Sequence, residues 1–267
     1  MTGDLQEFLS GEKLYGDDFG PEEAELWRRD ELEAYAELGS KDRDAYTYKY
    51  HELNILHGYR HLPPRRFSSV LGFGAAYGHE LSPIIERVER ITIVDPSEAF
   101  VSSQVGGVPC RFVKPAAGGR MPFADAEFDL ITCLGVLHHI PKVSAAAVEL
   151  YRCLAPGGYM LLREPIRSMG DWSRQRPGLT RHERGIPLRI LRDIVTRAGF
   201  AIRRQSLCIF PLVMGLANRL GRDGYNGKLT TRADAALCVL FGRNDRYHPG
   251  ALRRRLSPAC AYLVLAK

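Results

Sequence analysis

A glycine-rich segment between Val70 and Gly78 has the composition of a ligand-binding turn. It reads VLGFGAAYG, a strand that runs into a turn and then into a helix. Small residues in such a turn let a ligand approach the backbone closely, as nucleotide-like cofactors require. The Gly-x-Gly-x-x-x-Gly spacing differs from the Gly-x-Gly-x-x-Gly that binds a dinucleotide pyrophosphate, which counts against an NAD enzyme. Taken alone, the segment is also compatible with a tight turn that binds nothing.

A carboxylate follows the next strand along the chain. Asp95 ends the run ITIV about 20 residues after the loop, the distance at which an acidic side chain accepts both hydroxyl protons of an adenosine ribose. The alternative is an aspartate that only caps the turn before Pro96. The loop and Asp95 together make a stronger prediction than either feature alone.

Two histidines and a glutamate are candidates for proton transfer. His139, and after it His138, follow a strongly apolar strand, and an imidazole suits the removal of a hydroxyl proton near neutral pH. The alternative is a histidine that fixes the start of the next helix. Glu164 follows a later strand and is a second candidate base or a substrate-positioning group, with a salt bridge to Arg163 or another arginine as the alternative.

The elements that must position these residues alternate between strands and helices. Apolar runs separated by amphipathic helical patterns favour a β-α-β assembly with a mostly parallel sheet. The closing run has no crossover helix before it, so we expect an antiparallel strand at the sheet edge. Seven strands are predicted, at 67–73, 91–94, 110–113, 128–134, 159–163, 201–209 and 261–266. Helices are predicted between them at about 83–89, 97–104, 142–154 and from Pro187 to Gly199.

Two further segments flank this core. Residues 1–66 are predicted to form an N-terminal helical lid, with one helix from Pro21 and a second, aromatic helix that carries Tyr46, Tyr48, Tyr50 and His51. Residues 67–209 and 259–267 are the predicted core, and residues 210–258 are read as a helical insertion that forms a wall of the acceptor pocket. We see no internal repeat.

Composition places the chain among ordinary globular proteins. The 267 residues are 45% hydrophobic and 25% charged, which excludes disordered and fibrous classes. No stretch is long enough to span a membrane, and the acidic N-terminus does not resemble a secretory signal, so we expect a cytoplasmic protein without a membrane partner. Six dispersed cysteines without a Cys-x-x-Cys pair predict reduced thiols and no zinc site. The net charge of +6 is spread along the sequence and favours a solvated basic surface over a nucleic-acid interface.

Three further motifs, in order, resemble those of the class I S-adenosylmethionine-dependent methyltransferases, in particular the group that acts on small molecules. They are MPFADAEFDL at 121–130, VLHHIP at 136–141 and LAPGG at 154–158. With the glycine loop and Asp95, the resemblance covers residues 67–200. It implies a Rossmann-like sheet of seven strands with the last one antiparallel, and S-adenosylmethionine as cofactor.

The resemblance also implies roles for individual residues. Asp95 and Pro96 would lie at the ribose, Ala117 and Met121 would border the adenine, and Leu134 would lie beneath the cofactor. The methionine part would be surrounded by Gly72, Phe73, Gly74, Ala75 and Gly78.

The chain departs from the family at three positions. The family usually has an acidic residue where this chain has Gly72, a glycine at Ala76, and an acidic residue near Ala117. The methyl group of Ala76 is tolerable if its backbone angles are ordinary, whereas each missing carboxylate removes hydrogen bonds worth about 1.5–3 kcal/mol. Glu80 or an N-terminal tyrosine is the candidate for compensation.

The sequence therefore predicts methylation, with oxygen as the methylated atom, of a small molecule such as a sugar, a glycan or a secondary metabolite. His139 would remove the hydroxyl proton, and alignment of donor and acceptor would supply most of the rate. The alternative is a non-catalytic methyltransferase-like binding or scaffolding protein. A nucleic-acid or protein methyltransferase is disfavoured, because the chain has no Asn/Asp-Pro-Pro-Tyr-type tetrad and no recognition module.

Overall fold

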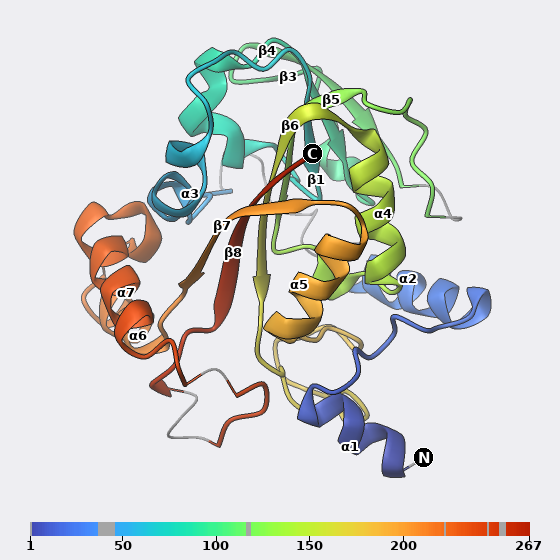
Figure 1. The fold of residues 1–267 in the computed structure, drawn as a ribbon, viewed down its shortest axis with the longest axis vertical. Coiled ribbons are helices and arrows are strands. Elements are labelled where there is room, and N and C mark those ends of the chain that lie inside the picture. Colours follow the sequence, from blue (N-terminus) through green and yellow to red (C-terminus); the bar gives the residue numbers. More distant parts are fainter. Residues whose placement is uncertain (1, 37–45, 116–118, 222, 245, 251–254) are drawn as a thin grey trace.

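The fold is an α/β arrangement around one mixed sheet, seen in a computed structural model (Figure 1). The structure describes residues 2–36, 46–115, 119–221, 223–244, 246–250 and 255–267. Eight strands are present in this part of the chain: β1 (Val70–Phe73), β2 (Ile91–Val94), β3 (Gln104–Val105), β4 (Val108–Val113), β5 (Phe128–Leu134), β6 (Leu154–Pro165), β7 (Ala201–Cys208) and β8 (Cys260–Ala266). The Rossmann-like fold class predicted from the sequence is confirmed.

The strands lie in the order β3-β4-β2-β1-β5-β6-β8-β7. Strands β4, β2, β1, β5 and β6 are parallel to one another, and β8 is antiparallel to both β6 and β7. The last strand is therefore antiparallel as predicted, but the expected edge position is wrong. Every residue of β8 is buried, whereas β7 carries exposed charged residues and forms the edge.

The eighth strand arises from a short hairpin that the sequence reading missed. Gly106 and Gly107 both have positive φ values, 56° and 82°, and join β3 to β4 in antiparallel register. Two residues of positive φ form the tight turn that suits the twist of paired strands. The predicted helix at 97–104 shrinks to the single turn η5 (Glu98–Phe100).

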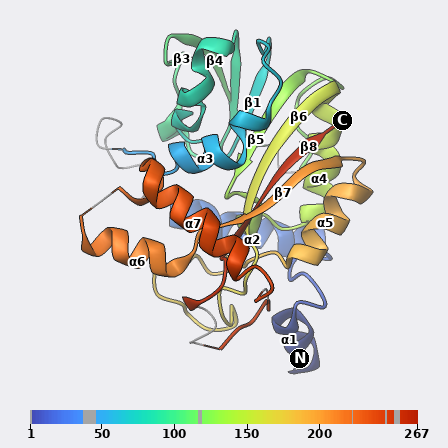
Figure 2. The ribbon, with the colours of Figure 1, turned by 60° about the vertical axis from the view of Figure 1, so that its left-hand side comes forward.

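Helices cover both faces of the sheet (Figures 1 and 2). One core holds β5 residues such as Ile131 together with the apolar faces of α4 (Val143–Cys153) and α5 (Leu188–Arg197). The other core holds β5 Leu130 with α3 (His51–His57) and the 3₁₀ helix η4 (His79–Arg87). Alternate β5 residues point to opposite cores, as in a strand that is buried on both faces.

The N-terminal region differs from the prediction in two respects. Helix α1 (Thr2–Ser10) precedes the predicted helix, which is α2 (Pro21–Ala36). Tyr46, Tyr48 and Tyr50 lie in an irregular segment before α3, so the predicted aromatic helix is wrong at these positions. Residues 37–45, between the two predicted helices, lie outside the described residues.

The segment after β7 is helical, as predicted for the insertion, and contains α6 (Pro211–Arg219) and α7 (Lys228–Leu240), joined through the turn η7 (Gly224–Asn226). The buried Asp234 on α7 accepts the backbone N–H groups of Ile209 and Phe210 and the hydroxyl of Tyr225. These bonds hold α7 against the end of β7. None of the helices in the part of the chain that the structure describes has the length and apolar character needed to span a lipid bilayer.

Candidate functional site

The loop after β1 and the carboxylate after β2 meet at the carboxyl edge of the sheet. The backbone N–H of Ala76 donates to Asp95 Oδ2 at 3.2 Å, and Ser97 N–H donates to Asp95 Oδ1 at 3.1 Å. Strands β1 and β2 are adjacent and parallel, so both chain segments leave the sheet on the same side. The two sequence features therefore converge on one place, which is where open α/β sheets bind ligands.

Close packing explains the small residues of the loop. A Cβ atom on Gly74 (φ 68°) would lie 2.6 Å from the side chain of Val136, which follows β5. A Cβ atom on Gly72 would lie 2.7 Å from Ala75 and 3.9 Å from Thr132 Oγ1. The acidic residue usual in the family would therefore not fit at position 72 without moving the loop.

Ala76 does not have ordinary backbone angles. Its φ is 48°, in the left-handed region that disfavours a side chain. The methyl group of Ala76 is therefore not harmless, because it would be so only with ordinary backbone angles. The backbone of the loop is strained next to Asp95.

We expect Ala76→Gly to raise the free energy of unfolding by about 1 kcal/mol, because glycine relieves the left-handed strain. Urea denaturation of both proteins measures the change. Ala75→Gly is the matched control: Ala75 is buried and has no positive φ, so its replacement should destabilise the protein. Equal effects of the two substitutions would contradict the assignment of strain to Ala76.

Two buried carboxylates lie at this edge. Burial raises the pKa of Asp95 to about 6, and burial raises the pKa of Glu80 to about 7. Among the described residues, Glu80 Oε1 and Thr132 Oγ1 are buried and form no hydrogen bond of good geometry, although the Thr132 hydroxyl is close enough to lower the pKa of Glu80. Poorly satisfied buried oxygens are costly, so a ligand that brings N–H or O–H groups would stabilise this site. These atoms fit the amino and hydroxyl groups of an adenosyl amino acid.

Ligand binding through Asp95 should depend on pH with a defined sign. The ionised carboxylate accepts two hydroxyl protons, whereas the protonated acid cannot. With a pKa of about 6, Asp95 is mostly ionised at pH 7, and about one molecule in eleven is ionised at pH 5. We therefore expect protonation of Asp95 to lower the affinity for S-adenosylmethionine, measured by calorimetry, about tenfold between pH 7 and pH 5, and protonation of Glu80, whose pKa is about 7, to add to this fall. The Asp95→Asn protein should bind weakly and keep only the Glu80 part of the pH dependence, and an unchanged slope would rule out Asp95 as a cause.

Aromatic residues cover the loop. The ring of Tyr46 lies 5.4 Å from that of Tyr77 and 5.5 Å from that of His79. Tyr50 stacks on Tyr225 of the insertion, 5.8 Å between ring centres. The irregular segment before α3 thus connects the glycine loop to the insertion.

Four of the remaining predicted cofactor residues lie at the same edge. Phe73 and Leu134 end β1 and β5, Gly78 (φ 71°) directly precedes η4, and Pro96 is exposed after Asp95. Met121 is buried in the core that contains Val94. Ala117 lies outside the described residues.

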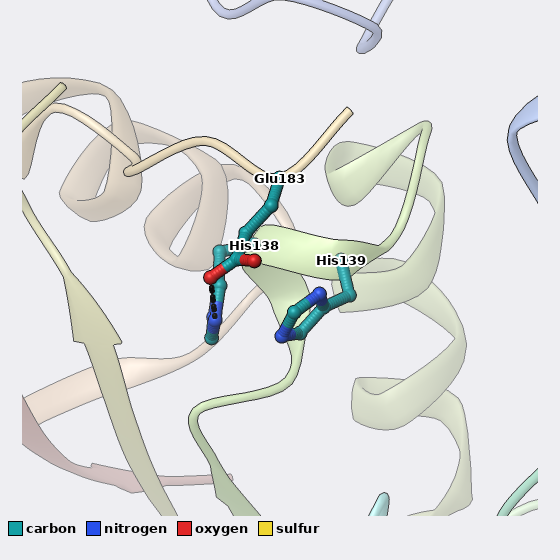
Figure 3. A group of neighbouring side chains, drawn as sticks. All are labelled: His138, His139 and Glu183. Atoms are coloured by element: carbon teal, nitrogen blue, oxygen red, sulfur yellow. Dashed lines mark ion pairs between the residues drawn. The ribbon is translucent and has the colours of Figure 1, made fainter. Parts of the chain in front are cut away.

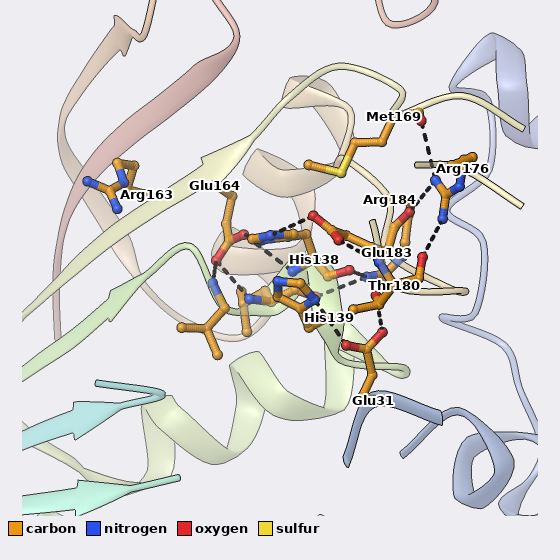
Figure 4. A network of polar contacts seen from close by, with 12 residues as sticks. Glu31, His138, His139, Arg163, Glu164, Met169, Arg176, Thr180, Glu183 and Arg184 are labelled. Atoms are coloured by element: carbon orange, nitrogen blue, oxygen red, sulfur yellow. Dashed lines mark hydrogen bonds and ion pairs between the residues drawn. The ribbon is translucent and has the colours of Figure 1, made fainter. Parts of the chain in front are cut away.

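Glu164, on β6, is the centre of a buried hydrogen-bond network (Figure 4). It is fully buried and accepts the backbone N–H groups of Val136, Leu137 and His138 at 2.9, 2.8 and 3.3 Å. Its Oε2 also lies 2.8 Å from His138 Nδ1. All of these partners belong to the turn after β5, so Glu164 fixes this turn and orients His138.

The expected salt bridge between Glu164 and Arg163 is wrong. The buried Arg163 guanidinium donates to Asn54 Oδ1 at 3.1 Å and to the Leu134 carbonyl at 3.3 Å, and it lies 4.2 Å above the ring of Tyr50. Adjacent residues of a strand point to opposite faces, which separates the two side chains. Arg163 instead ties β6 to α3 and to the aromatic segment.

His139 is held by a glutamate that sequence reasoning missed. Glu31, on α2, is buried, and its Oε2 lies 3.1 Å from His139 Nδ1. The other oxygen accepts the hydroxyl of Thr180 at 2.5 Å, and Trp27 Nε1 donates to the His139 carbonyl at 2.7 Å. A carboxylate that accepts the Nδ1 proton fixes the ring orientation and the tautomer, as in other acid–histidine pairs. Nothing local in the sequence marks Glu31, because its partner is 108 positions away.

His138, His139 and Glu183 form a compact group (Figure 3). One potential ligand atom from each lies within 4.8 Å of the others, and His138 Nε2 is 3.6 Å from Glu183 Oε1. Burial and the neighbouring His139 lower the pKa of His138. Two imidazoles and a carboxylate can hold a transition-metal ion or pass a proton. Loss of activity in the presence of a chelator would indicate metal binding, and unchanged activity would indicate proton transfer.

The fully buried Arg184 holds the backbone of this turn. It donates to the carbonyls of Leu137, His138 and Ile140 at 3.0, 2.8 and 2.9 Å, and it lies 4.6 Å above the ring of Trp27. A separate cavity of about 560 Å³ lies between the N-terminal segment and α4 and α5, and it contains none of the predicted site residues.

Residues 71–162 match the family model of the methyltransferase domain. A Mycolicibacterium smegmatis (strain ATCC 700084 / mc(2)155) protein called "Probable S-adenosylmethionine-dependent methyltransferase" is 28% identical over 57% of this chain and 58% of its own length. The "Uncharacterized methyltransferase YcgJ" of Bacillus subtilis (strain 168) is 32% identical over 35% of this chain and 39% of its own length. The chain thus matches less than two thirds of either curated relative.

The fold also matches solved structures. The [4+2]-cyclase SpnF superposes with a TM-score of 0.56 at 17% identity, over 92% of this chain and 96% of that one. Residues 71–162 thus resemble a methyltransferase domain, as the sequence motifs indicated, and the superposition shows that the whole chain has a fold found in solved structures. A protein named a cyclase has the same fold, so the fold alone does not define the activity of this chain.

Proposed function

We propose that the protein transfers a methyl group from S-adenosylmethionine to a hydroxyl oxygen of a small molecule such as a sugar, a glycan or a secondary metabolite. The observation that carries the proposal is the placement of two sites along one sheet edge. The Ala76–Asp95 contact lies after β1 and β2, and the Glu31–His139 pair lies after the adjacent strand β5. In this proposal the donor site lies after β1 and β2, and the base lies after the neighbouring strand β5.

The residues present fit the cofactor. Asp95 would hold the ribose hydroxyls, Glu80 would take the amino group that an acidic residue at position 72 would otherwise bind, and Met121 with Ala117 would border the adenine. Phe73, Gly74, Ala75 and Gly78 would surround the methionine part, and Leu134 would lie beneath it. The bound cofactor supplies a methyl group on a positively charged sulfur, which needs alignment more than activation.

The base of the reaction would be His139. Glu31 holds Nδ1, so Nε2 would take the hydroxyl proton as the acceptor oxygen attacks in line with the methyl–sulfur bond. His138 and Glu164 would position His139 through the turn after β5, since Glu164 bonds three of its N–H groups. We propose no metal in this step. Tyr46 and the helices of the insertion would border the acceptor.

Calorimetric titration with S-adenosylmethionine and with its demethylated product tests the first half of the proposal. Wild type should bind both, and Asp95→Ala should bind at least about tenfold more weakly, because a charge-assisted hydrogen bond contributes about 1.5–3 kcal/mol. Transfer of labelled methyl groups to a panel of sugars and phenols tests the second half. Binding without transfer to any hydroxyl acceptor would contradict methylation at oxygen, and absence of binding would favour the scaffolding alternative or a different cofactor.

A further inference from the structure

The positive charge of the chain is concentrated in the insertion. Residues 210–258 contain nine Lys or Arg and three Asp or Glu, a net charge of +6. The whole chain has the same net charge of +6, so the rest of the sequence is neutral on balance. The expectation of evenly spread charge is therefore wrong.

Exposed cations dominate the described part of this segment. They are Arg219, Lys228, Arg232, Arg243, Arg246 and Arg255. Among residues that the structure describes, none of these six forms an ion pair with a carboxylate. The buried carboxylate of Asp234 accepts the backbone N–H groups of Ile209 and Phe210, and the carboxylate of Asp223 accepts a side-chain N–H of Asn226. The basic surface is thus not neutralised from within.

The same helices expose large apolar side chains. Of ten large hydrophobic residues exposed in the described structure, six lie on α6, on α7 or just beyond α6: Leu212, Leu216, Leu220, Leu229, Val239 and Leu240. Leu212, Leu216 and Leu220 follow a four-residue spacing and so line one side of α6. The exposed fractions of Leu229 and Val239 are 77% and 84%.

The buried side of the helix pair is already used. Ala217 on α6 and Asp234 and Cys238 on α7 are buried, and η7 packs against α3. Figures 1 and 2 show α6 and α7 beside each other on the side of the sheet opposite α4 and α5. The exposed leucines therefore belong to the outer side of the pair, where nothing within the described chain covers them.

We propose that α6 and α7 dock the protein on the surface of an anionic lipid bilayer. Apolar side chains flanked by Lys and Arg are the pattern of helices that lie in a membrane interface. The cations attract anionic headgroups, and the leucines insert between them. A second copy of the chain would bring two positive surfaces together, which disfavours self-association. The sequence analysis expects no membrane partner because no stretch is long enough to span a bilayer. Docking on a bilayer surface needs no spanning helix, so that argument does not apply to α6 and α7.

Vesicle sedimentation without S-adenosylmethionine tests this inference independently of the proposed catalysis. Wild type should bind vesicles of phosphatidylcholine with 30% phosphatidylserine, should bind pure phosphatidylcholine at least about tenfold more weakly, and should be released by salt. Replacing Leu212, Leu216 and Leu220 by serine should weaken binding at least about tenfold. Arg232→Gln should weaken it about fivefold, the equivalent of about 1 kcal/mol per basic residue.

Matched controls separate the helix pair from general surface effects. Val148→Ser removes an exposed apolar residue from α4, and Arg192→Gln removes an exposed cation from α5. Both should bind vesicles like wild type, and all variants should keep the melting temperature and the cofactor affinity of wild type. No binding to anionic vesicles at low salt overturns the inference, as does an equal loss in the controls. A dimer that the leucine variant abolishes would reassign the surface to self-association, and binding to polyglutamate but not to vesicles would reassign it to an acidic protein.

Discussion

Replacing His139 by asparagine is expected to lower the turnover number for methyl transfer by about 10²- to 10⁴-fold, the usual contribution of a general base. Asparagine keeps a polar group of similar reach next to Glu31, so the fold should survive. The proposed cofactor site lies after β1 and β2, whereas His139 follows β5. The affinity for S-adenosylmethionine should therefore change little. Steady-state kinetics with a hydroxyl acceptor, together with calorimetry of cofactor binding, measures both quantities.

Glu31→Gln is the companion variant. It preserves the shape of the Glu31 side chain but removes the charge that stabilises a protonated His139, so we expect a smaller fall in turnover, about tenfold, with an unchanged KM. A rise in KM alone would show that Glu31 acts only in packing α2. The rate should also survive dialysis against EDTA. Loss of activity that zinc or manganese restores would instead assign His138, His139 and Glu183 to a metal site.

The second large effect concerns stability. Glu164→Ala should lower the free energy of unfolding by about 3–5 kcal/mol, because it removes a buried charge and leaves buried N–H groups after β5 without acceptors. Three backbone donors and the His138 ring lose their partner at once. Guanidinium denaturation measures the loss, and activity should fall with it because the turn carries His138 and His139.

A partly exposed glutamate supplies the control for this experiment. Glu127 Oε2 also accepts a backbone N–H, that of Ala124 at 2.8 Å, and Oε1 pairs with the exposed Arg111, but both contacts lie near the surface, where water can replace them. Glu127→Ala should therefore cost less than about 1 kcal/mol. If Glu164→Ala were as mild as Glu127→Ala while activity disappeared, Glu164 would act in the reaction and the positioning role would be wrong.

Glu164 and Glu31 show how far a sequence can define a site. Glu164 was recognisable because it follows an apolar strand at the ligand-binding edge, although its role as base or salt-bridge partner could not be decided. Glu31 was not recognisable, because an acidic residue in an amphipathic helix is ordinary on the surface. Only the packing of α2 against the turn after β5, through Trp27 and Glu31, buries it beside His139.

Among the strands, the sequence was reliable where burial is continuous. The apolar runs of β1, β2, β5 and β8 predict strands, because such runs are stable only inside a sheet. The order of β7 and β8 was not predictable from the position of the last run. The sheet places the wholly apolar β8 inside and the charged β7 outside, which minimises the exposure of apolar surface.

The sequence by itself determined the class of fold, the glycine turn, Asp95 and the histidine pair, because these depend on local residue types and on the spacing of strands. The tertiary structure alone decided that Ala76 is strained, that Arg163 bonds Asn54 while Glu164 bonds His138, and that the positive charge shares two helices with exposed leucines. These features depend on which groups lie together after folding, and residues far apart along the chain leave no mark of their proximity in its local pattern.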